Sequence, residues 1–377
     1  MMKRFSLKFL VFCFLLALVF ACSNGDLESY LPGPGNGTET EQPGPEPGDG
    51  GDEAEDGKKP QDPKPDDEEE EEAASEPKAE LLSAKVVSET EIVFEFSAAV
   101  RLQSLAFETC KELKSVEEGN TLTLFLEEEL KPGLRFSVEL EVEDEWENLI
   151  NLQIPLISVN NRLPKLLINE LRTEWSNTST SKRAEFIEFR MLSEGNLGGL
   201  RVFAASNRIN PLIYEFKPIE VREGEYVVLH MRTLESSSKN EYGDDLDESG
   251  GRDSSPTARD LWIPGSTKLL RKTDAVYVLD LNDQVLDAVM IAERPDSPWP
   301  NSSLIAAAEF LFEQGAWVSA AGGVSSPADA VSSAAIGSAL TRSISRDEAA
   351  ENTRTAADWF VTGNNGVTPG LPNIPRP

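Results

Sequence analysis

The stretch FSVELEVE, Phe136–Glu143, has an apolar residue at every even position and a polar residue at every odd position. A period of two residues is typical of a β-strand with one buried face and one solvated face. In Ile92–Phe96, the residues Ile92, Phe94 and Phe96 would share one face of a strand, and Thr121–Leu126 is another strand candidate. Lys131-Pro132-Gly133 predicts a turn before the alternating strand. The segment 79–160 is therefore expected to form a small β-sandwich.

Two longer stretches extend this pattern: LLSAKVVSETEIVFEFSAAV at 81–100 and LKPGLRFSVELEVEDEWENL at 130–149. Together they resemble the bacterial Ig-like domains that recur in surface proteins. The matching elements are the opening strand pair, the Leu-x-Pro-Gly turn and a closing turn. The family often has Gly-Asn in that closing turn, where this chain has Glu147-Asn148. Cys110 is expected to be a small buried hydrophobe within this domain.

A second series of strand candidates follows a hinge at Asn160–Pro164. Alternate residues of these strands, among them Ile168, Phe186 and Val202, are expected to line one core. Pro369-Gly370 permits a final turn, because proline fixes φ and glycine tolerates positive φ. The segments in question are Leu167–Leu171, Ala184–Phe189, Gly199–Phe203, Ile219–Gly224, Tyr226–Leu229, Ala275–Asp280, Val285–Val289, Ser343–Asp347, Ala356–Phe360 and Thr368–Asn373.

The order of motifs in these segments, from I-N-E and E-F-I-E to S-x-S-R and a terminal T-P-G-x-x-N, resembles the lamin-tail domain. That domain is an Ig-like β-sandwich found in nuclear lamins and widely in secreted bacterial proteins. The resemblance implies a second sandwich over 161–377, and binding or anchoring rather than turnover. Two insertions depart from a minimal member, near 233–270 and 295–339. The second is rich in Ala and Ser and contains a predicted helix, Ser302–Gln314.

Four charged residues of these motifs form the candidate polar site: Glu170, Glu185, Glu188 and Arg346. One interpretation is an internal network of salt bridges and turns that fixes the strand ends. The other is a polar patch that faces a ligand. The sequence alone leaves both open.

One acidic segment of the first insertion resembles a calcium loop, with oxygen ligands at alternate positions in Asp245, Asp247 and Ser249, and with Asp253 further on. The twelfth position is Pro256, where the helix-loop-helix form of such a site needs a bidentate glutamate. No helical pattern flanks the segment. It is therefore interpreted as a flexible acidic loop, and no metal site is predicted.

Catalytic signatures are missing from the sequence. His230 is the single histidine, lies at the end of a strand pattern and is interpreted as structural. A zinc site of cysteine and histidine needs several such ligands, and the chain has three cysteines in all. The sequence contains no Gly-x-Ser-x-Gly elbow, phosphate-binding glycine loop or His-Glu-x-x-His motif. We therefore expect a non-enzymatic protein without a cofactor.

The amino terminus is typical of an export signal. Basic residues at Lys3, Arg4 and Lys8 precede the uncharged apolar run Phe9–Phe20. That run is too short for a bilayer, which requires roughly 20 helical residues, so 1–21 is predicted to be a signal peptide. Val19-Phe20-Ala21-Cys22 resembles a lipobox, which implies cleavage before Cys22 and a diacylglycerol on its thiol.

Residues 22–78 after this cleavage site are rich in proline, glycine and acidic residues and have almost no apolar residues after Leu31. Such a segment cannot bury a core and is predicted to be a disordered linker. Proline and repulsion between like charges keep it extended, with a maximum reach on the order of 170 Å. We expect it to hold the folded part away from a membrane.

The chain has a formal net charge of −31, and no segment of it is basic. A protein that binds nucleic acid mainly through the backbone phosphates needs a positively charged face, so nucleic acid is not an expected partner. The sequence favours an exported lipoprotein of the outer membrane or cell surface that binds a protein or glycan. The alternatives are a structural envelope spacer and, least favoured, a degenerate hydrolase. An exposed polar or aromatic cluster around Trp175, Trp262 and Trp299 would favour binding, and a featureless acidic surface would favour the spacer. Trp359 is expected in the core.

Overall fold

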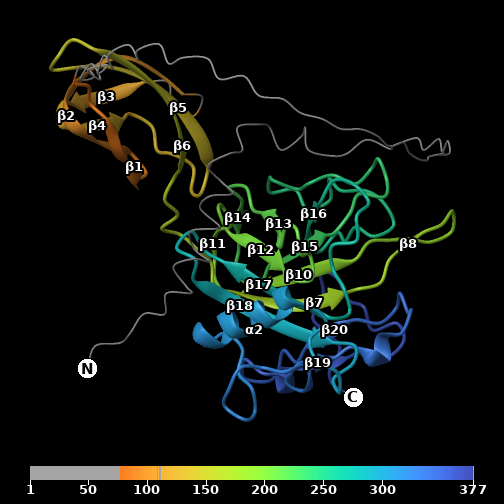
Figure 1. Cartoon of the computed structure of the whole chain (residues 1–377). Coiled ribbons are helices and arrows are strands. Elements are labelled where there is room, and N and C mark those ends of the chain that lie inside the picture. Colours follow the sequence, from red (N-terminus) through yellow and green to blue (C-terminus); the bar gives the residue numbers. More distant parts are fainter. Residues whose placement is uncertain (1–76, 108, 110–111, 377) are drawn as a thin grey trace, which may run out of the picture. The chain divides into compact units, whose positions relative to one another are not determined.

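The computed structural model of the chain describes residues 77–107, 109 and 112–376. The predicted signal peptide 1–21, Cys22, nearly all of the linker 22–78 and Cys110 lie outside the described residues. The described part is all-β, as the alternating segments predict, with a short helix in the second half (Figure 1). Within it, no helix combines the length and the hydrophobicity needed to cross a membrane.

The first half forms one antiparallel sheet with the strand order β3-β4-β2-β5-β6, and β1 pairs with β2 beside this path. All three strand segments expected here are confirmed, in β2, β4 and β5. The strands are β1 (Leu81–Ser88), β2 (Glu91–Ala106), β3 (Leu113–Glu117), β4 (Gly119–Leu126), β5 (Arg135–Asp144) and β6 (Leu149–Ile157).

Strand β2 is long enough to pair twice. Its first part, Glu91–Glu95, pairs with β4, and its second part, Val100–Ala106, pairs with β5. The alternating residues Val138, Leu140 and Val142 of β5 are at most 2% exposed and pack with the apolar residues of β2 and β4 in one core. The period-2 pattern therefore identifies the buried face of this sheet correctly.

The second half is built from many short strands and four short helical segments. The strands are β7 (Leu166–Arg172), β8 (Ser176–Asn177), β9 (Lys182–Arg183), β10 (Phe186–Met191), β11 (Gly195–Asn196), β12 (Arg201–Ala204), β13 (Leu212–Glu215), β14 (Glu220–Val221), β15 (Tyr226–His230), β16 (Arg259–Trp262), β17 (Asp274–Leu279), β18 (Val285–Ala292), β19 (Val331–Ser332), β20 (Ile344–Arg346) and β21 (Trp359–Val361). The helix α2 spans Ser302–Glu313, and 3-10 turns span Pro327–Asp329, Ala334–Ile336 and Ala356–Asp358.

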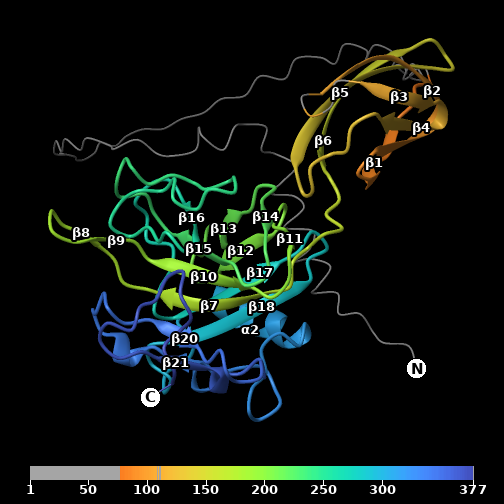
Figure 2. The same ribbon diagram turned by 180° about the vertical axis from the view of Figure 1, so that it is seen from behind.

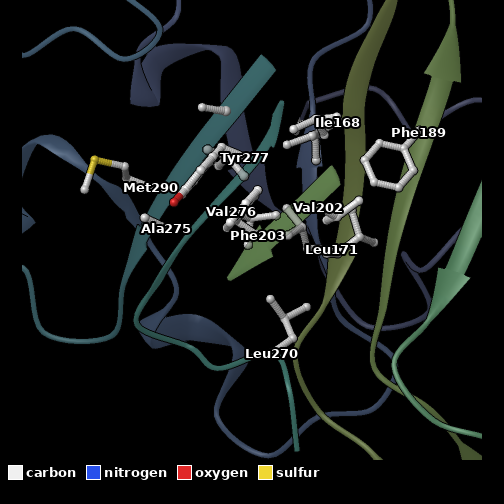
Figure 3. Packing of buried hydrophobic residues seen from close by; sticks show 14 of the residues in the cluster. Ile168, Leu171, Phe189, Val202, Phe203, Leu270, Ala275, Val276, Tyr277 and Met290 are labelled. Atoms are coloured by element: carbon white, nitrogen blue, oxygen red, sulfur yellow. The ribbon is translucent and has the colours of Figure 1, made fainter. Parts of the chain in front are cut away.

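Two of the sheets make the second sandwich. One, here the β7 sheet, has the order β16-β15-β10-β7-β20-β21, and the other, the β17 sheet, has the order β13-β12-β17-β18-β19. Figure 3 shows Ile168 and Phe189 of the β7 sheet across from Val202 and Val276 of the β17 sheet, all at most 1% exposed. The core thus lies between the inner faces of the two sheets.

The outer face of the β7 sheet is also buried, and this corrects one expectation. Phe186 does not line the central core with Ile168 and Val202; it packs with Tyr226, Val228 and Ala258 in a separate cluster. Its neighbour Ile187 points into the central core instead. Phe186 is nevertheless fully buried, because the first insertion and the C-terminal segment cover this face.

The two predicted insertions are ordered. The predicted helix is confirmed as α2, where Asn301 caps the first turn by accepting from the Leu304 N–H. Its buried side chains, including Leu304 and Leu311, join the central core. The helix itself lies beside β17 and β18 (Figure 2). The first insertion contributes β16, which pairs in parallel with β15 and was not expected from the sequence.

Candidate functional site

Glu170 lies on β7 with its carboxylate fully buried on the outer face of the sheet. One oxygen, Oε1, accepts from the Ser343 hydroxyl at 2.5 Å and from the Ser345 hydroxyl at 3.2 Å. The other, Oε2, accepts from the Thr368 N–H at 3.0 Å. Burial raises the pKa of this carboxyl group, although these donors and Arg172 oppose the shift.

Glu188 lies on β10 directly opposite Glu170 and is also fully buried. Its Oε2 accepts from the Gly370 N–H at 2.6 Å, and its Oε1 accepts from the Asn169 amide at 2.9 Å. Burial and then the neighbouring Glu170 raise its pKa well above the usual range. The two glutamates therefore form a buried pair in which ionisation of both groups is unfavourable.

The segment 367–373, here called the C-terminal strap, lies over this pair. Its Asn373 N–H donates to Glu348 Oε1 at 2.9 Å, and its side-chain amide donates to the carbonyl groups of Asn169 and Arg346. Gly370 has a φ of +75°, and a Cβ there would lie 2.4 Å from the Ser255 Oγ. The terminal T-P-G-x-x-N pattern is thus explained by contacts of its Thr, Gly and Asn with the sheet.

Arg346 belongs to a different cluster from the glutamates. Its Nε donates to the Ile168 carbonyl at 2.8 Å, and its Nη2 donates to Asp287 at 2.6 Å. The guanidinium also lies over the ring of Trp359, 4.4 Å from its centroid. Trp359 is 3% exposed, which confirms its expected place in the core.

Glu185 forms a third cluster. It accepts from Arg232 Nε at 2.6 Å and from Arg232 Nη2 at 2.5 Å, and both side chains are fully buried. The four predicted site residues are therefore all buried and satisfied by protein donors or acceptors, which matches the internal-network interpretation. Sequence reasoning missed the partners Arg232 and Asp287. Asp287 lies within the strand candidate Val285–Val289, whereas no pattern indicated Arg232.

The calcium candidates do not converge in the structure. Asp245 and Asp247 are exposed, whereas Ser249 and Asp253 are buried. Asp253 bonds Arg172 and the Ala184 N–H, so this end of the acidic segment is attached to β7 and to the residues before β10. Among residues 77–107, 109 and 112–376, no group of three or more His, Cys, Asp or Glu side chains could hold a metal ion.

His230 ends β15, as expected, and is fully buried. Its Nε2 lies 2.8 Å from Asp260 Oδ1, and its ring stacks on Trp262 with 3.7 Å between centroids. Trp262 is 4% exposed, while Trp175 is 39% exposed and covered on one face by the Arg232 guanidinium. The indole N–H of Trp299 donates to the Ser325 carbonyl. Of these three tryptophans, Trp175 offers the most exposed ring.

A cavity of about 250 Å³ lies beside the strap and between β7, β10 and the loop after β20. Asn169 of the I-N-E motif and Arg346 of the S-x-S-R motif contribute to its wall. Glu348 belongs to both the wall and the strap contacts, and it also pairs with Arg190 Nη1 at 3.0 Å. The wall residues are Leu167, Asn169, Arg190, Leu192, Arg346, Asp347, Glu348, Ala350, Glu351, Asn352 and Asp358.

One known protein family matches most of this half of the chain. The family described as "TP_1001_2nd: protein second domain" matches residues 164–361, which contain both main sheets of the second sandwich and most of the cavity wall. A relative from Treponema pallidum (strain Nichols), named "Uncharacterized protein", is 31% identical over 179 residues. That match covers 44% of this chain and 43% of the relative, so it spans less than half of the relative's length.

Two solved structures share weaker similarity with the chain. One is a DUF4876 family protein from Bacteroides thetaiotaomicron, with 12% identity, a TM-score of 0.22 and coverage of 58% of this chain and 78% of that one. The other is the N-terminal part of the bacterial S-layer protein SbsC, with 10% identity, a TM-score of 0.16 and coverage of 57% and 43%.

Proposed function

The chain belongs to the family described as "TP_1001_2nd: protein second domain", and we propose that this domain is a non-enzymatic binding module of a lipid-anchored envelope protein. The module binds a protein or glycan partner at the cavity beside the strap. The similarity of its motifs to the lamin-tail domain supports an interaction role. The lipobox-like sequence at Cys22 and the long acidic linker support display away from a membrane.

The observation that carries this proposal is the cavity itself. Its wall joins residues from β7, β10 and the loop 347–352, and most of them are polar or charged. Arg190 is 35% exposed and uses Nη1 for Glu348, which leaves further N–H donors for a ligand. Glu351 is exposed and adds acceptors, while exposed Asn352 offers amide N–H donors, because its Oδ1 already accepts from Arg346 Nη1 and the Arg354 N–H. These donors and acceptors suit a ligand with hydroxyl, amide or charged groups.

A pair of charge reversals tests this site. Glu351→Lys changes the cavity wall, and Glu309→Lys makes the same charge change on the exposed face of α2. Envelope extracts are passed over the immobilised protein, and the captured partner is quantified for each variant. We expect Glu351→Lys to reduce capture at least tenfold and Glu309→Lys to leave it unchanged. Equal capture by both variants would mean that the partner binds at a surface other than the cavity.

The extract experiment also separates binding from the spacer alternative. If no partner is captured reproducibly by the wild-type protein, the structural envelope spacer becomes the better description. A partner that stays bound at high salt must be held by contacts other than exposed charges, because salt screens such charges strongly.

The lipid anchor is tested separately on the full chain. Cells grown with labelled palmitate should incorporate label into the wild-type protein and not into Cys22→Ala. Because the anchor is covalent, its attachment does not depend on charge attraction to the membrane. An unlabelled wild-type protein, or equal labelling of the Cys22→Ala protein, would contradict the anchor.

A further inference from the structure

The wall of the cavity beside the strap carries more negative than positive charge. Ions outside the wall leave this balance unchanged, because Arg346 pairs with Asp287 and Asp347 lies 4.0 Å from Arg376. A ligand with a positive charge is therefore favoured. The wall has four carboxylates against two guanidinium groups, a formal charge of −2, on Asp347, Glu348, Glu351, Asp358, Arg190 and Arg346.

The two arginines of the wall are already paired with carboxylates. Arg346 is 4% exposed, and its guanidinium donates to three protein acceptors, one of which is Asp287. Arg190 is more exposed, and its Nη1 lies 3.0 Å from Glu348 Oε2. Glu351, by contrast, is exposed and has no ion-pair partner among the residues that the structure describes. The charge that a ligand meets in this cavity is therefore negative.

The size and the apolar part of the cavity favour a single long side chain as the occupant. Its volume of about 250 Å³ lies below the roughly 300–1,000 Å³ of typical small-molecule sites. Three aliphatic residues, Leu167, Leu192 and Ala350, belong to the wall, and Leu192 is 42% exposed. Lysine and arginine lay their carbon stems along such apolar surface and keep the charged end among polar groups. The wall thus offers both kinds of contact that a basic side chain needs.

We propose that the cavity binds a lysine or arginine side chain of a partner protein. The carbon stem packs against the two leucines and the alanine of the wall, and the charged end pairs with Glu351. Arg190 donates its remaining N–H groups to a backbone carbonyl group next to the bound side chain. The net charge of −31 steers such a basic partner toward the protein. This inference rests on the function proposed above and narrows its ligand to a basic segment of a protein.

Methyl NMR of the protein with labelled leucine tests this ligand class directly. The signals of Leu167 and Leu192 are assigned by substitution with methionine and followed while a probe is added. The basic probes are Nα-acetyl-lysine methylamide and Nα-acetyl-arginine methylamide. Nα-acetyl-norleucine methylamide supplies a similar stem without the charge, and glucosamine supplies an ammonium group on a sugar ring.

A basic probe should shift both leucine signals. Its dissociation constant should be lower than that of the norleucine probe by roughly fivefold, the upper range for exposed charge pairs, and this difference should shrink at high salt. Equal binding of the basic and norleucine probes would overturn the proposal, because charge would then play no part. Tighter binding of glucosamine would assign the site to a glycan and overturn it as well, as would the lack of a shift with either basic probe.

Two glutamine variants locate the charge that the probe contacts. Glu351→Gln should weaken binding of the lysine probe roughly threefold and leave the norleucine probe unaffected. Glu309→Gln makes the same charge change on the exposed face of α2 and should alter neither. A Glu351→Gln protein that binds the lysine probe with wild-type affinity would contradict the proposed ion pair.

These measurements use no cell extract, so the ligand class and the proposed function can fail separately. If Glu351→Lys loses an envelope partner while neither basic probe binds, the cavity keeps its binding function and the basic ligand is wrong. If the basic probes bind and no partner is captured from extracts, the ligand class is supported and the envelope partner is not.

Discussion

Replacement of Glu185 by glutamine removes one charge from a fully buried ion pair. The carboxylate accepts two bonds from Arg232, at 2.6 and 2.5 Å, and both side chains are 0% exposed. Arg232 has one further acceptor, the Ser266 carbonyl, and lies 3.9 Å from the centroid of the Trp175 ring. In Glu185→Gln the guanidinium therefore stays buried and charged with no anion in contact.

The expected cost is large for a single substitution. Removing one partner of a buried pair typically destabilises a protein by about 3–5 kcal/mol, because the other charge remains desolvated. Glutamine retains one acceptor oxygen and so one of the two hydrogen bonds, which favours the lower end, about 3 kcal/mol. For a domain of this size, that loss lowers the melting temperature by roughly 6–12 °C.

A matched control is available in the same half of the chain. Arg162 and Glu220 also lie 2.5 Å apart, but their side chains are 57% and 58% exposed, so water screens the pair. Glu220→Gln should cost no more than about 1 kcal/mol. Urea unfolding followed by tryptophan fluorescence compares the two variants, with Trp175 as a local reporter. Equal losses for Glu185→Gln and Glu220→Gln would refute the reasoning from burial.

Three further outcomes follow from the structure. Gly370→Ala should raise hydrogen exchange of the strap at least tenfold at every pH, because the new Cβ would lie 2.4 Å from Ser255 Oγ and 2.9 Å from Ala258 Cβ. Burial raises the pKa of Asp274 to about 6. The folded protein therefore holds this proton more tightly than the unfolded chain, and the free energy of unfolding should fall by roughly 3 kcal/mol as pH rises from about 4 to 6. Urea titrations of Asp274→Asn should show a smaller decline over the same range. Glu147→Gly should stabilise the sheet of β1–β6 by about 0.5–1 kcal/mol in thermal unfolding, because residue 147 has a φ of +67°.

Alternation predicted β2, β4, β5 and several strands of the second half, with much of the core, but it did not predict β3 or β16. In β5, the even residues Val138, Leu140 and Val142 are buried because a strand turns alternate side chains to opposite faces. The same rule places Ile168 and Val202 in the second core. These inferences depend on neighbours within a few residues, so a single sequence contains the information they need.

The outer face of the β7 sheet could not be predicted in this way. This face carries Glu170, Glu188 and His230; strict alternation would place Glu170 on the face of Ile168, and an irregularity in the β7–β10 register turns it to the outer face instead. Polar faces of antiparallel sheets usually meet water. Here all three are 0% exposed, since the first insertion and the strap return to cover them. Which distant segment covers a face depends on contacts across more than a hundred residues, such as Gly370 with Glu188. No pattern within a few residues of sequence indicates such contacts.

Because their polar residues are buried, the motifs of the second half indicate how the domain folds rather than what it binds. Glu170, Glu188 and the serines of S-x-S-R bond one another or the strap, and Glu185 bonds Arg232, so the hydrogen-bonding groups of these motifs are used within the fold. A motif of this kind specifies how the domain closes, and it can be shared by domains with different partners. The residues free to distinguish partners are those that line the cavity without holding the strap, above all Glu351 and Asn352. Specificity should therefore follow the loop 347–352 rather than the motifs that identify the domain.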